Sequence, residues 1–388
     1  MQKKIYIKCI ELFKSIFHKI LFFVFSLLPV NEKKIVFITL HSDNFSGNNK
    51  CIYDELKRRK LDLTYKLYGM DDIKLSNSNI IEKLIMSIGI DYNICTAKYV
   101  IINDFYSLFT KVKVRKQTML IQVWHAGGAF KKFGKMSLRN MNNLEFMKRV
   151  NSAHGQYDKL IVSSKEVIDI YSDSLGIDSK RIYPIGIPRA DIFFNEDRMN
   201  DIRQILYEKY EELQGKKIIL YAPTFRDDNR YRSSIALNLN YMLEQLEEEY
   251  LIILKMHPFE RSKVKIESNM SHKIFDLSNE EINDLLIIAD ILITDYSSLI
   301  FEYAILQKPM IFFAYDLEKY ENELRGFYYP YTDFVPGPIA YSTEEIVKCI
   351  RKDEWNFGQI REFAMRFNEY FDGKATERFI EDVLFEEK

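Results

Sequence analysis

The chain has 388 residues, of which 47% are hydrophobic, so it is long enough for two domains and apolar enough to build sizeable cores. Its 55 basic and 56 acidic side chains leave a net charge of −1, which excludes the positive field that typifies nucleic-acid-binding proteins. The four cysteines show no C-x-x-C spacing, which excludes a disulfide framework and a zinc finger and is typical of a reducing compartment.

Residues 1–30 carry five lysines against one acid, Glu11, with apolar residues at helical spacing. The apolar run ILFFVFSLLPV (20–30) is too short to cross a bilayer, which takes about 20 residues. We expect a basic amphipathic helix that lies on an anionic membrane surface. A signal peptide and a buried core helix are the two alternatives.

From residue 31 onward, continuous apolar strands alternate with helical stretches such as 166–175 and 197–213. This alternation predicts an α/β fold with two doubly wound, Rossmann-like domains. The predicted division is a helical segment 1–30, an N-terminal domain 31–205 and a C-terminal domain 206–388, whose charged helical tail can cross back to the N-terminal domain. The predicted strands are 33–40, 63–69, 98–104, 118–125, 157–164 and 181–186 in the first series, and 216–223, 251–258, 273–278, 291–297 and 310–316 in the second.

Doubly wound sheets bind ligands at the carboxyl ends of their strands, so polar residues at those ends are candidate site residues. His125 follows one strand and precedes Gly127 and Gly128, which would let the backbone approach a ligand. Arg226 follows a second strand, where a guanidinium could clamp phosphate. Lys255 and His257 follow a third, on one face by alternation.

The most informative stretch is DILITDYSSLIFEY (290–303), in which a buried strand runs through Asp295 into Ser297 and Ser298 and then into a helical pattern. The start of a helix favours an anion, although a serine there is also an ordinary N-cap. Glu302, one turn later, could reach the hydroxyl pair of a ribose.

The strand-end residues together predict a nucleotide-diphosphate site in a central cleft between the two domains. Neither a G-x-x-x-x-G-K-[ST] loop nor a G-x-G-x-x-G fingerprint is present, which counts against an ATPase and a dehydrogenase. No carboxylate cluster demands a metal, and no cofactor is certain. Asp227, Asp228 and Asp295 are the candidate ligands if a divalent cation takes part.

With these motifs in view, the chain resembles the CDP-glycerol glycerophosphotransferase family, the teichoic acid glycerophosphate transferases of Gram-positive bacteria. The family pattern has WHGTP where this chain has WHAGG (124–128), which puts the substrate and the acceptor in question more than the chemistry. The matching stretches are VWHAGGAFKKFG (123–134), IGIPRAD (185–191), YAPTFRDD (221–228), LKMHP (254–258) and the run 284–331.

The resemblance implies a GT-B type fold at the cytoplasmic face of the membrane, as a peripheral, monotopic protein. It implies transfer of glycerol phosphate from CDP-glycerol to a hydroxyl of a lipid-linked acceptor, such as a polyprenyl-diphosphate-linked saccharide, with release of CMP. In that reaction His125 acts as general base. The expected catalytic residues are His125 and His257, and the expected substrate-binding residues are Gly127, Gly128, Arg189, Pro223, Thr224, Arg226, Lys255, Asp295, Ser297, Ser298 and Glu302.

Four alternatives stay open at this point. The donor could be CDP-ribitol, and the polymer could belong to a capsule rather than to teichoic acid. The enzyme could instead be a GT-B glycosyltransferase that uses a nucleotide sugar. Outside enzymes, the chain could be a membrane-bound assembly protein with a vestigial nucleotide pocket.

Overall fold

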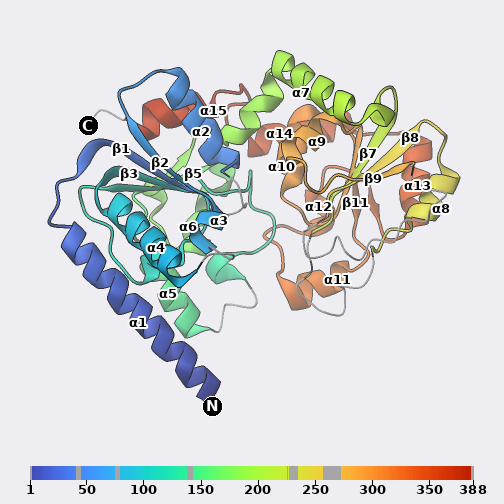
Figure 1. Cartoon of the computed structure of the whole chain (residues 1–388). Helices are drawn as coiled ribbons and strands as arrows, with labels where there is room; N and C mark the ends of the chain where they lie inside the picture. The colour runs from blue at the N-terminus through green and yellow to red at the C-terminus, as the bar shows by residue number, and fades with distance from the viewer. Residues whose placement is uncertain are drawn as a thin grey trace. The chain divides into compact units, whose positions relative to one another are not determined.

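The computed structural model describes residues 2–40, 45–74, 79–137, 143–224, 226, 235–256 and 272–385. By its contacts the chain forms two compact units (Figure 1). Unit 1 comprises Met1–Ala126, Phe133–Arg189 and Lys374–Lys388, and unit 2 comprises Gly127–Lys132 and Ala190–Gly373. Each unit holds a six-stranded sheet in which every neighbouring pair is parallel, so the predicted α/β class with two parallel sheets is confirmed.

The sheet of unit 1 has the order β2-β1-β3-β4-β5-β6. Helix α2 and the C-terminal segment Phe379–Leu384 pack on one face of it, and the strands are apolar on both faces because helices cover both. The strands are β1 (Asn31–Ile38), β2 (Thr64–Tyr68), β3 (Ala97–Ile102), β4 (Met119–Gln122), β5 (Lys159–Val162) and β6 (Ile182–Pro184). The helices are α1 (Gln2–Phe25), α2 (Gly47–Arg58), α3 (Met70–Lys74), α4 (Ile80–Cys95), α5 (Leu144–His154), α6 (Ile168–Leu175) and α15 (Ala375–Arg378).

The sheet of unit 2 has the order β12-β11-β10-β7-β8-β9, which places the first strand of the unit, β7, between β8 and β10. Helices α8 and α13 pack on one face of it. The strands are β7 (Lys217–Tyr221), β8 (Tyr250–Leu254), β9 (Ile274–Asp276), β10 (Ile291–Thr294), β11 (Met310–Phe313) and β12 (Ile339–Ala340). The helices are α7 (Glu196–Lys209), α8 (Leu239–Gln245), α9 (Ile282–Ile288), α10 (Leu299–Tyr303), α11 (Leu317–Lys319), α12 (Tyr331–Phe334), α13 (Thr343–Lys352) and α14 (Phe357–Phe367).

Eleven of the strands coincide with predicted ones, and β12 was not predicted. It has only two residues and follows Pro336 and Pro338, so it carries neither the length nor the alternation of a recognisable strand. Helix α4 shows how local sequence sets a boundary. Its capping box joins Asn79 and Glu82 through reciprocal hydrogen bonds of 3.0 and 3.1 Å.

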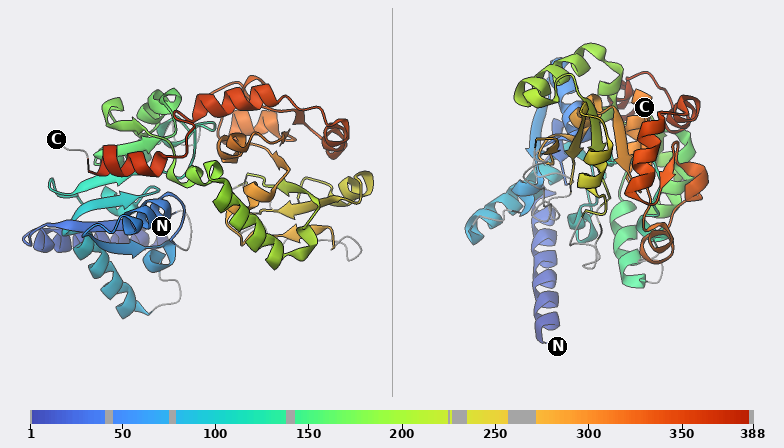
Figure 2. Two further views of the ribbon diagram at one scale, coloured as in Figure 1. Left: turned by 90° about the horizontal axis from the view of Figure 1, so that it is seen from above. Right: turned by 90° about the vertical axis from the view of Figure 1, so that its right-hand side faces the viewer.

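Helix α1 lies along unit 1 and packs on α4 (Figures 1 and 2). His18 Nδ1 lies 2.6 Å from Asp91 Oδ2 of α4, and burial raises the pKa of that carboxyl. Most described apolar side chains of α1 are exposed, including Phe13 at 72% and Phe23 at 70%, so the buried-core alternative for residues 1–30 is wrong. Within the described residues, no helix combines the length and the apolar character needed to cross a membrane.

Candidate active site

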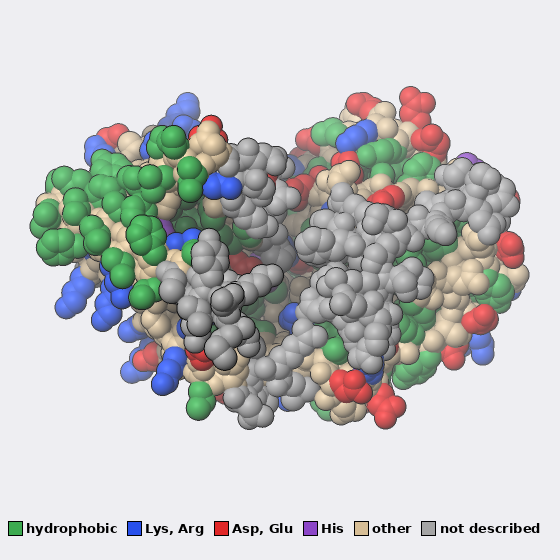
Figure 3. Space-filling view, turned by 60° about the horizontal axis from the view of Figure 1, so that its bottom comes forward, with side chains coloured by type: hydrophobic (Ala, Val, Ile, Leu, Met, Phe, Trp, Pro, Cys, Tyr) green, Lys and Arg blue, Asp and Glu red, His purple; other side chains and the backbone are tan. Residues whose placement is uncertain are grey.

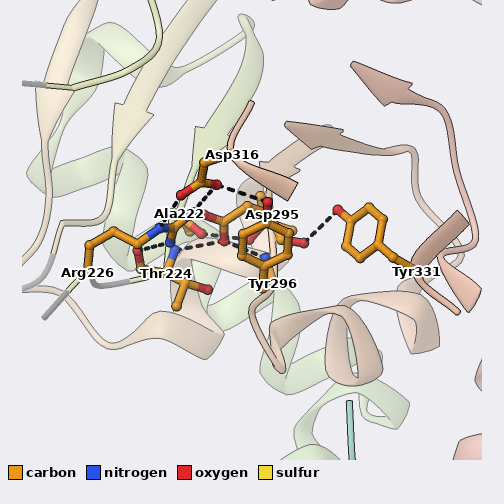
Figure 4. A network of polar contacts seen from close by, with 8 residues as sticks. Ala222, Thr224, Arg226, Asp295, Tyr296, Asp316 and Tyr331 are labelled. Atoms are coloured by element: carbon orange, nitrogen blue, oxygen red, sulfur yellow. Dashed lines mark hydrogen bonds and ion pairs between the residues drawn. The ribbon is translucent and has the colours of Figure 1, made fainter. Parts of the chain in front are cut away.

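In unit 2 the strand order reverses between β7 and β10, because β7 continues to β8 on one side and β10 continues to β11 on the other. Such a switch point is where doubly wound sheets bind ligands. The loops that follow the two strands are joined there: Thr224 N donates to Asp295 Oδ1 at 2.8 Å, and Thr294 Oγ1 donates to Ala222 O at 2.7 Å (Figure 4). The structure therefore brings together Thr224 and Asp295 from two of the predicted strand ends, with Pro223 directly before Thr224.

Arg226 lies at the centre of this network rather than facing solvent. Its guanidinium binds Asp316 in a bidentate manner at 2.9 and 3.0 Å and forms an ion pair with Asp295 at 2.8 Å. Burial opposes the charge, but the two carboxylates outweigh it and raise the pKa of Arg226. Removing one partner of a buried ion pair lowers the free energy of unfolding by about 3–5 kcal/mol. Arg226 therefore holds the network in one arrangement.

Aromatic side chains close the network. Tyr296 Oη donates to Asp316 Oδ1 at 2.9 Å, and Tyr331 Oη donates to Asp295 O at 3.0 Å. The Arg226 guanidinium carbon lies 5.0 Å from the ring centres of both Tyr296 and Tyr320. Asp316 and the tyrosines were not among the predicted site residues, although Asp316 stands at the end of a strand that the sequence did predict, 310–316.

Strand β10 runs through Ser297 and Ser298 into α10, as the sequence predicts. Ser297 Oγ accepts a hydrogen bond from Leu299 N at 3.3 Å, whereas the Ser298 side chain makes no capping hydrogen bond. Glu302 is buried within α10. The helix itself has only five residues, so its own dipole adds little to anion binding.

Gly127 and Gly128 belong by their contacts to unit 2, and the segment they begin packs against α10. A Cβ on Gly128 would lie 2.5 Å from the Phe301 ring, and one on Gly127 would lie 3.2 Å from Phe301 Cβ. The close approach that requires glycine at position 128 is therefore made to Phe301.

Lys255 follows β8, and its ammonium donates to Ser278 O at 2.9 Å and to Glu280 O at 2.5 Å. His257, Asp227 and Asp228 lie outside the described residues. Within the described residues, no group of three His, Cys, Asp or Glu side chains is arranged to hold a metal ion.

In unit 1, His125 follows β4, and its imidazole is held by the end of the neighbouring strand β3. Nδ1 lies 3.2 Å from Asn103 O and 3.5 Å from Asp104 Oδ2. A carbonyl oxygen can only accept, so we assign the proton to Nδ1, which leaves Nε2 as a proton acceptor. The His125 ring also stacks on Trp124, with ring centres 4.7 Å apart.

The turn that presents His125 is strained, because Trp124 has a φ of +49°, which residues other than glycine rarely adopt. Asn48 of α2 supports it: Asn48 Nδ2 donates to Val123 O and Trp124 O, each at 3.0 Å. Asn48 Oδ1 accepts from Arg189 N at 3.0 Å, which connects the predicted site residue Arg189 to the same turn. Asp104 and Asn48 were missed in the sequence, although Asn103-Asp104 ends the predicted strand 98–104.

The two units, each with a six-stranded parallel sheet, define an α/β protein whose unit 2 has polar strand ends at a switch point. The chain belongs to the CDP-Glycerol:Poly(glycerophosphate) glycerophosphotransferase family, whose model matches residues 20–385. The teichoic acid poly(ribitol-phosphate) polymerase of Bacillus spizizenii is 37% identical over 377 residues, which cover 96% of this chain and 59% of that protein. The chain thus spans less than two thirds of the length of that relative.

A second relative is the teichoic acid glycerol-phosphate primase of Bacillus subtilis, which is 35% identical over 358 residues, covering 88% of this chain and 91% of the primase. Among solved structures, the wall teichoic acid polymerase TagF matches with a TM-score of 0.77 at 26% identity, over 97% of this chain and 95% of the TagF chain. The resemblance inferred from the motifs is therefore confirmed.

Proposed function

We propose that the protein transfers glycerol phosphate from CDP-glycerol to a hydroxyl of a lipid-linked acceptor and releases CMP, in the synthesis of teichoic acid or a related polymer. The observation that carries the proposal is the His125 imidazole, oriented by Asn103 and Asp104 in a chain of the CDP-glycerol family. CDP-ribitol is the alternative donor, since the relatives include both glycerol-phosphate and ribitol-phosphate enzymes.

In the proposed reaction the acceptor hydroxyl attacks the β-phosphorus of the donor in line with the bond to the bridging oxygen. The new bond joins the acceptor oxygen to the β-phosphorus, and the bridging oxygen leaves on CMP with the bonding electron pair. His125 Nε2 takes the proton of the hydroxyl, and the Asp104 carboxylate stabilises the imidazolium that forms. Phosphoryl transfer depends mainly on positioning and on charge stabilisation, which the remaining residues supply.

On the donor side, we assign the diphosphate to Ser297, Ser298, Thr224 and the residues after β8, Lys255 and His257, and the ribose to Glu302. Arg226, paired with Asp295 and Asp316, acts through the network that fixes Thr224. Pro223, Gly127, Gly128 and Arg189 stay in the proposal as residues that shape the site.

We also propose that α1 lies on the cytoplasmic face of the membrane. Its exposed apolar side chains gather on one side of the molecule, where green atoms form a broad patch in Figure 3. Lys19, Lys111 and Lys113 line a hollow beside Phe22 at this helix, so positive charge accompanies the apolar surface.

The test is incubation with CDP-glycerol, CDP-ribitol or a UDP-sugar, together with a synthetic lipid-linked disaccharide, followed by mass spectrometry of the lipid. We expect a mass increase of one or more glycerol phosphate units with equimolar CMP, and its loss in His125→Ala. Transfer of a sugar with release of UDP would contradict the proposal. The absence of turnover with every CDP-alditol would favour a non-enzymatic role.

A further inference from the structure

Two cations that the sequence assigned to the donor diphosphate are engaged inside unit 2. Arg226 is buried between two carboxylates, and the Lys255 ammonium donates to two backbone carbonyls. The charge of Arg226 is offset by two carboxylates before any ligand arrives. Lys255 keeps its charge, because its two partners are neutral carbonyl oxygens. With Arg226 offset, a phosphate group bound in this unit would be stabilised by further positive charge.

Lys131 and Arg325 bring such charge to one place. Lys131 forms an antiparallel bridge with Phe327, and Lys132 N donates to Gly326 O at 3.0 Å, so the segment 127–132 runs beside the residues that follow Arg325. Burial, followed by the nearby Arg325 charge, lowers the pKa of Lys131 to about 7. Lys131 as a residue is half-buried, and its backbone bridge to Phe327 places it two residues from Arg325 on the facing segment.

No acid of the described part of the chain lies within ion-pair distance of Lys131 or Arg325. Among the described residues, Asp295 is the carboxylate whose charge raises the pKa of Lys131, and Asp295 is itself paired with Arg226. Two cations held together in this way are unfavourable until an anion joins them.

We infer that Lys131 and Arg325 together bind a phosphate group of a substrate. An arginine can grip two phosphate oxygens at once, while a lysine supplies a point charge on a third. This inference rests on the proposed function, in which two substrates carry phosphate. One source is the diphosphate of the CDP-alditol, and the other is a phosphate of the lipid-linked acceptor.

The experiment compares Lys131→Met and Arg325→Met with the matched control Lys132→Met, which removes the same charge one residue away. Calorimetric titrations use CDP-glycerol in one arm and a short, soluble glycerol-phosphate oligomer in the other. We expect Lys131→Met and Arg325→Met to bind one of these about 10- to 100-fold more weakly, as is typical for a lost contact to a charged group. A weaker CDP-glycerol complex identifies the donor, and a weaker oligomer complex identifies the acceptor.

Unchanged affinity for both ligands would overturn the inference, as would a loss that Lys132→Met reproduces. If Lys131 instead only offsets the charge of Asp295, then Lys131→Met lowers the melting temperature and leaves both affinities intact. CMP release by the wild-type protein tests the proposed transferase activity. The affinities of the Lys131 and Arg325 variants test the phosphate site, so either can fail without the other.

Lys131→Arg provides a second test that leaves the charge in place. Among the described residues, the charges that act on Lys131 are those of Arg325, Arg226 and Asp295. Phosphate favours the charged ammonium, so the wild-type affinity should fall as the pH rises from 6 to 8.5, with uptake of close to one proton on binding at pH 8. Lys131→Arg should remove that pH dependence, whereas a wild-type affinity that is equal at the two pH values would overturn the inference.

Discussion

Replacing Asp104 with Asn removes the carboxylate that lies 3.5 Å from His125 Nδ1 and keeps an oxygen that can accept from Phe105 N. In the proposed mechanism the carboxylate matters most when the imidazole carries the proton of the acceptor hydroxyl. The substitution should therefore lower kcat and leave the Kd for CDP-glycerol nearly unchanged.

The size of the effect follows from the distance and the exposure. At 3.5 Å Coulomb's law gives about 1.2 kcal/mol in bulk water and about 2.4 kcal/mol at an effective dielectric constant of about 40. The two side chains are 24% and 28% exposed, which places the pair between these limits. The expected loss in kcat is therefore about 8- to 60-fold.

The assay is CMP release under saturating donor and acceptor, with direct titration of CDP-glycerol as the second readout. Asp169→Asn is the matched control, since Asp169 is an exposed aspartate of the same unit. A kcat within twofold of wild type, or an equal loss in the control, would refute the role of Asp104 as the residue that stabilises the His125 imidazolium.

Three further predictions concern packing, membrane binding and pH. Gly128→Ala should lower the free energy of unfolding by about 1–3 kcal/mol in urea titrations, because its Cβ would meet the Phe301 ring at 2.5 Å. Replacing Ile81 and Ile85 with Ser should weaken binding to anionic vesicles in flotation assays, since these side chains are 65% and 64% exposed on α4, the helix that packs on α1. Burial lowers the pKa of His154 to about 4, below the unfolded value of 6.5, so the unfolded chain takes up the proton first and stability should fall by up to about 3 kcal/mol as the pH drops through that window. His154→Leu should lack that loss in urea titrations at pH 7 and pH 4.5.

The first two of these predictions have a control variant in the chain, and the third has an outcome that would contradict it. Gly89→Ala on α4 adds a Cβ that meets nothing within 4 Å, so it should not destabilise the protein. Ile205→Ser removes an equally exposed isoleucine from α7 of unit 2 and should leave vesicle binding intact. The contradicting result would be an equal change in the free energy of unfolding between pH 7 and pH 4.5 for the wild type and for His154→Leu. That result would mean that His154 takes up its proton as readily in the folded chain as in the unfolded chain.

The sheets could be predicted from the sequence because each strand is a continuous apolar run bounded by polar residues. In β7, β10 and β11 this run ends at the residues that later meet in the network, so Arg226 and Asp295 could be named from their positions at strand ends. Thr224 was named through the family resemblance. Asp316 was missed because its role depends on the pairing of β10 with β11, which strand order decides and local pattern does not.

The role of the two glycines could not be read from the sequence for a related reason. Gly127 and Gly128 come two and three residues after His125, so a ligand-binding loop was the natural interpretation. The structure uses their small size to bring the chain against Phe301, a residue more than 170 positions later. Asn48 is a similar case, since its amide supports a turn some 75 residues away.

The last described segment of the chain has a consequence for how the protein is made. Phe379, Ile380, Val383 and Leu384 belong to the core of unit 1, yet they are translated after the whole of unit 2. While the ribosome is still synthesising unit 2, the apolar side of the finished N-terminal sheet that they cover stays open. Removal of residues 374–388 would therefore destabilise unit 1, most of which is synthesised before unit 2.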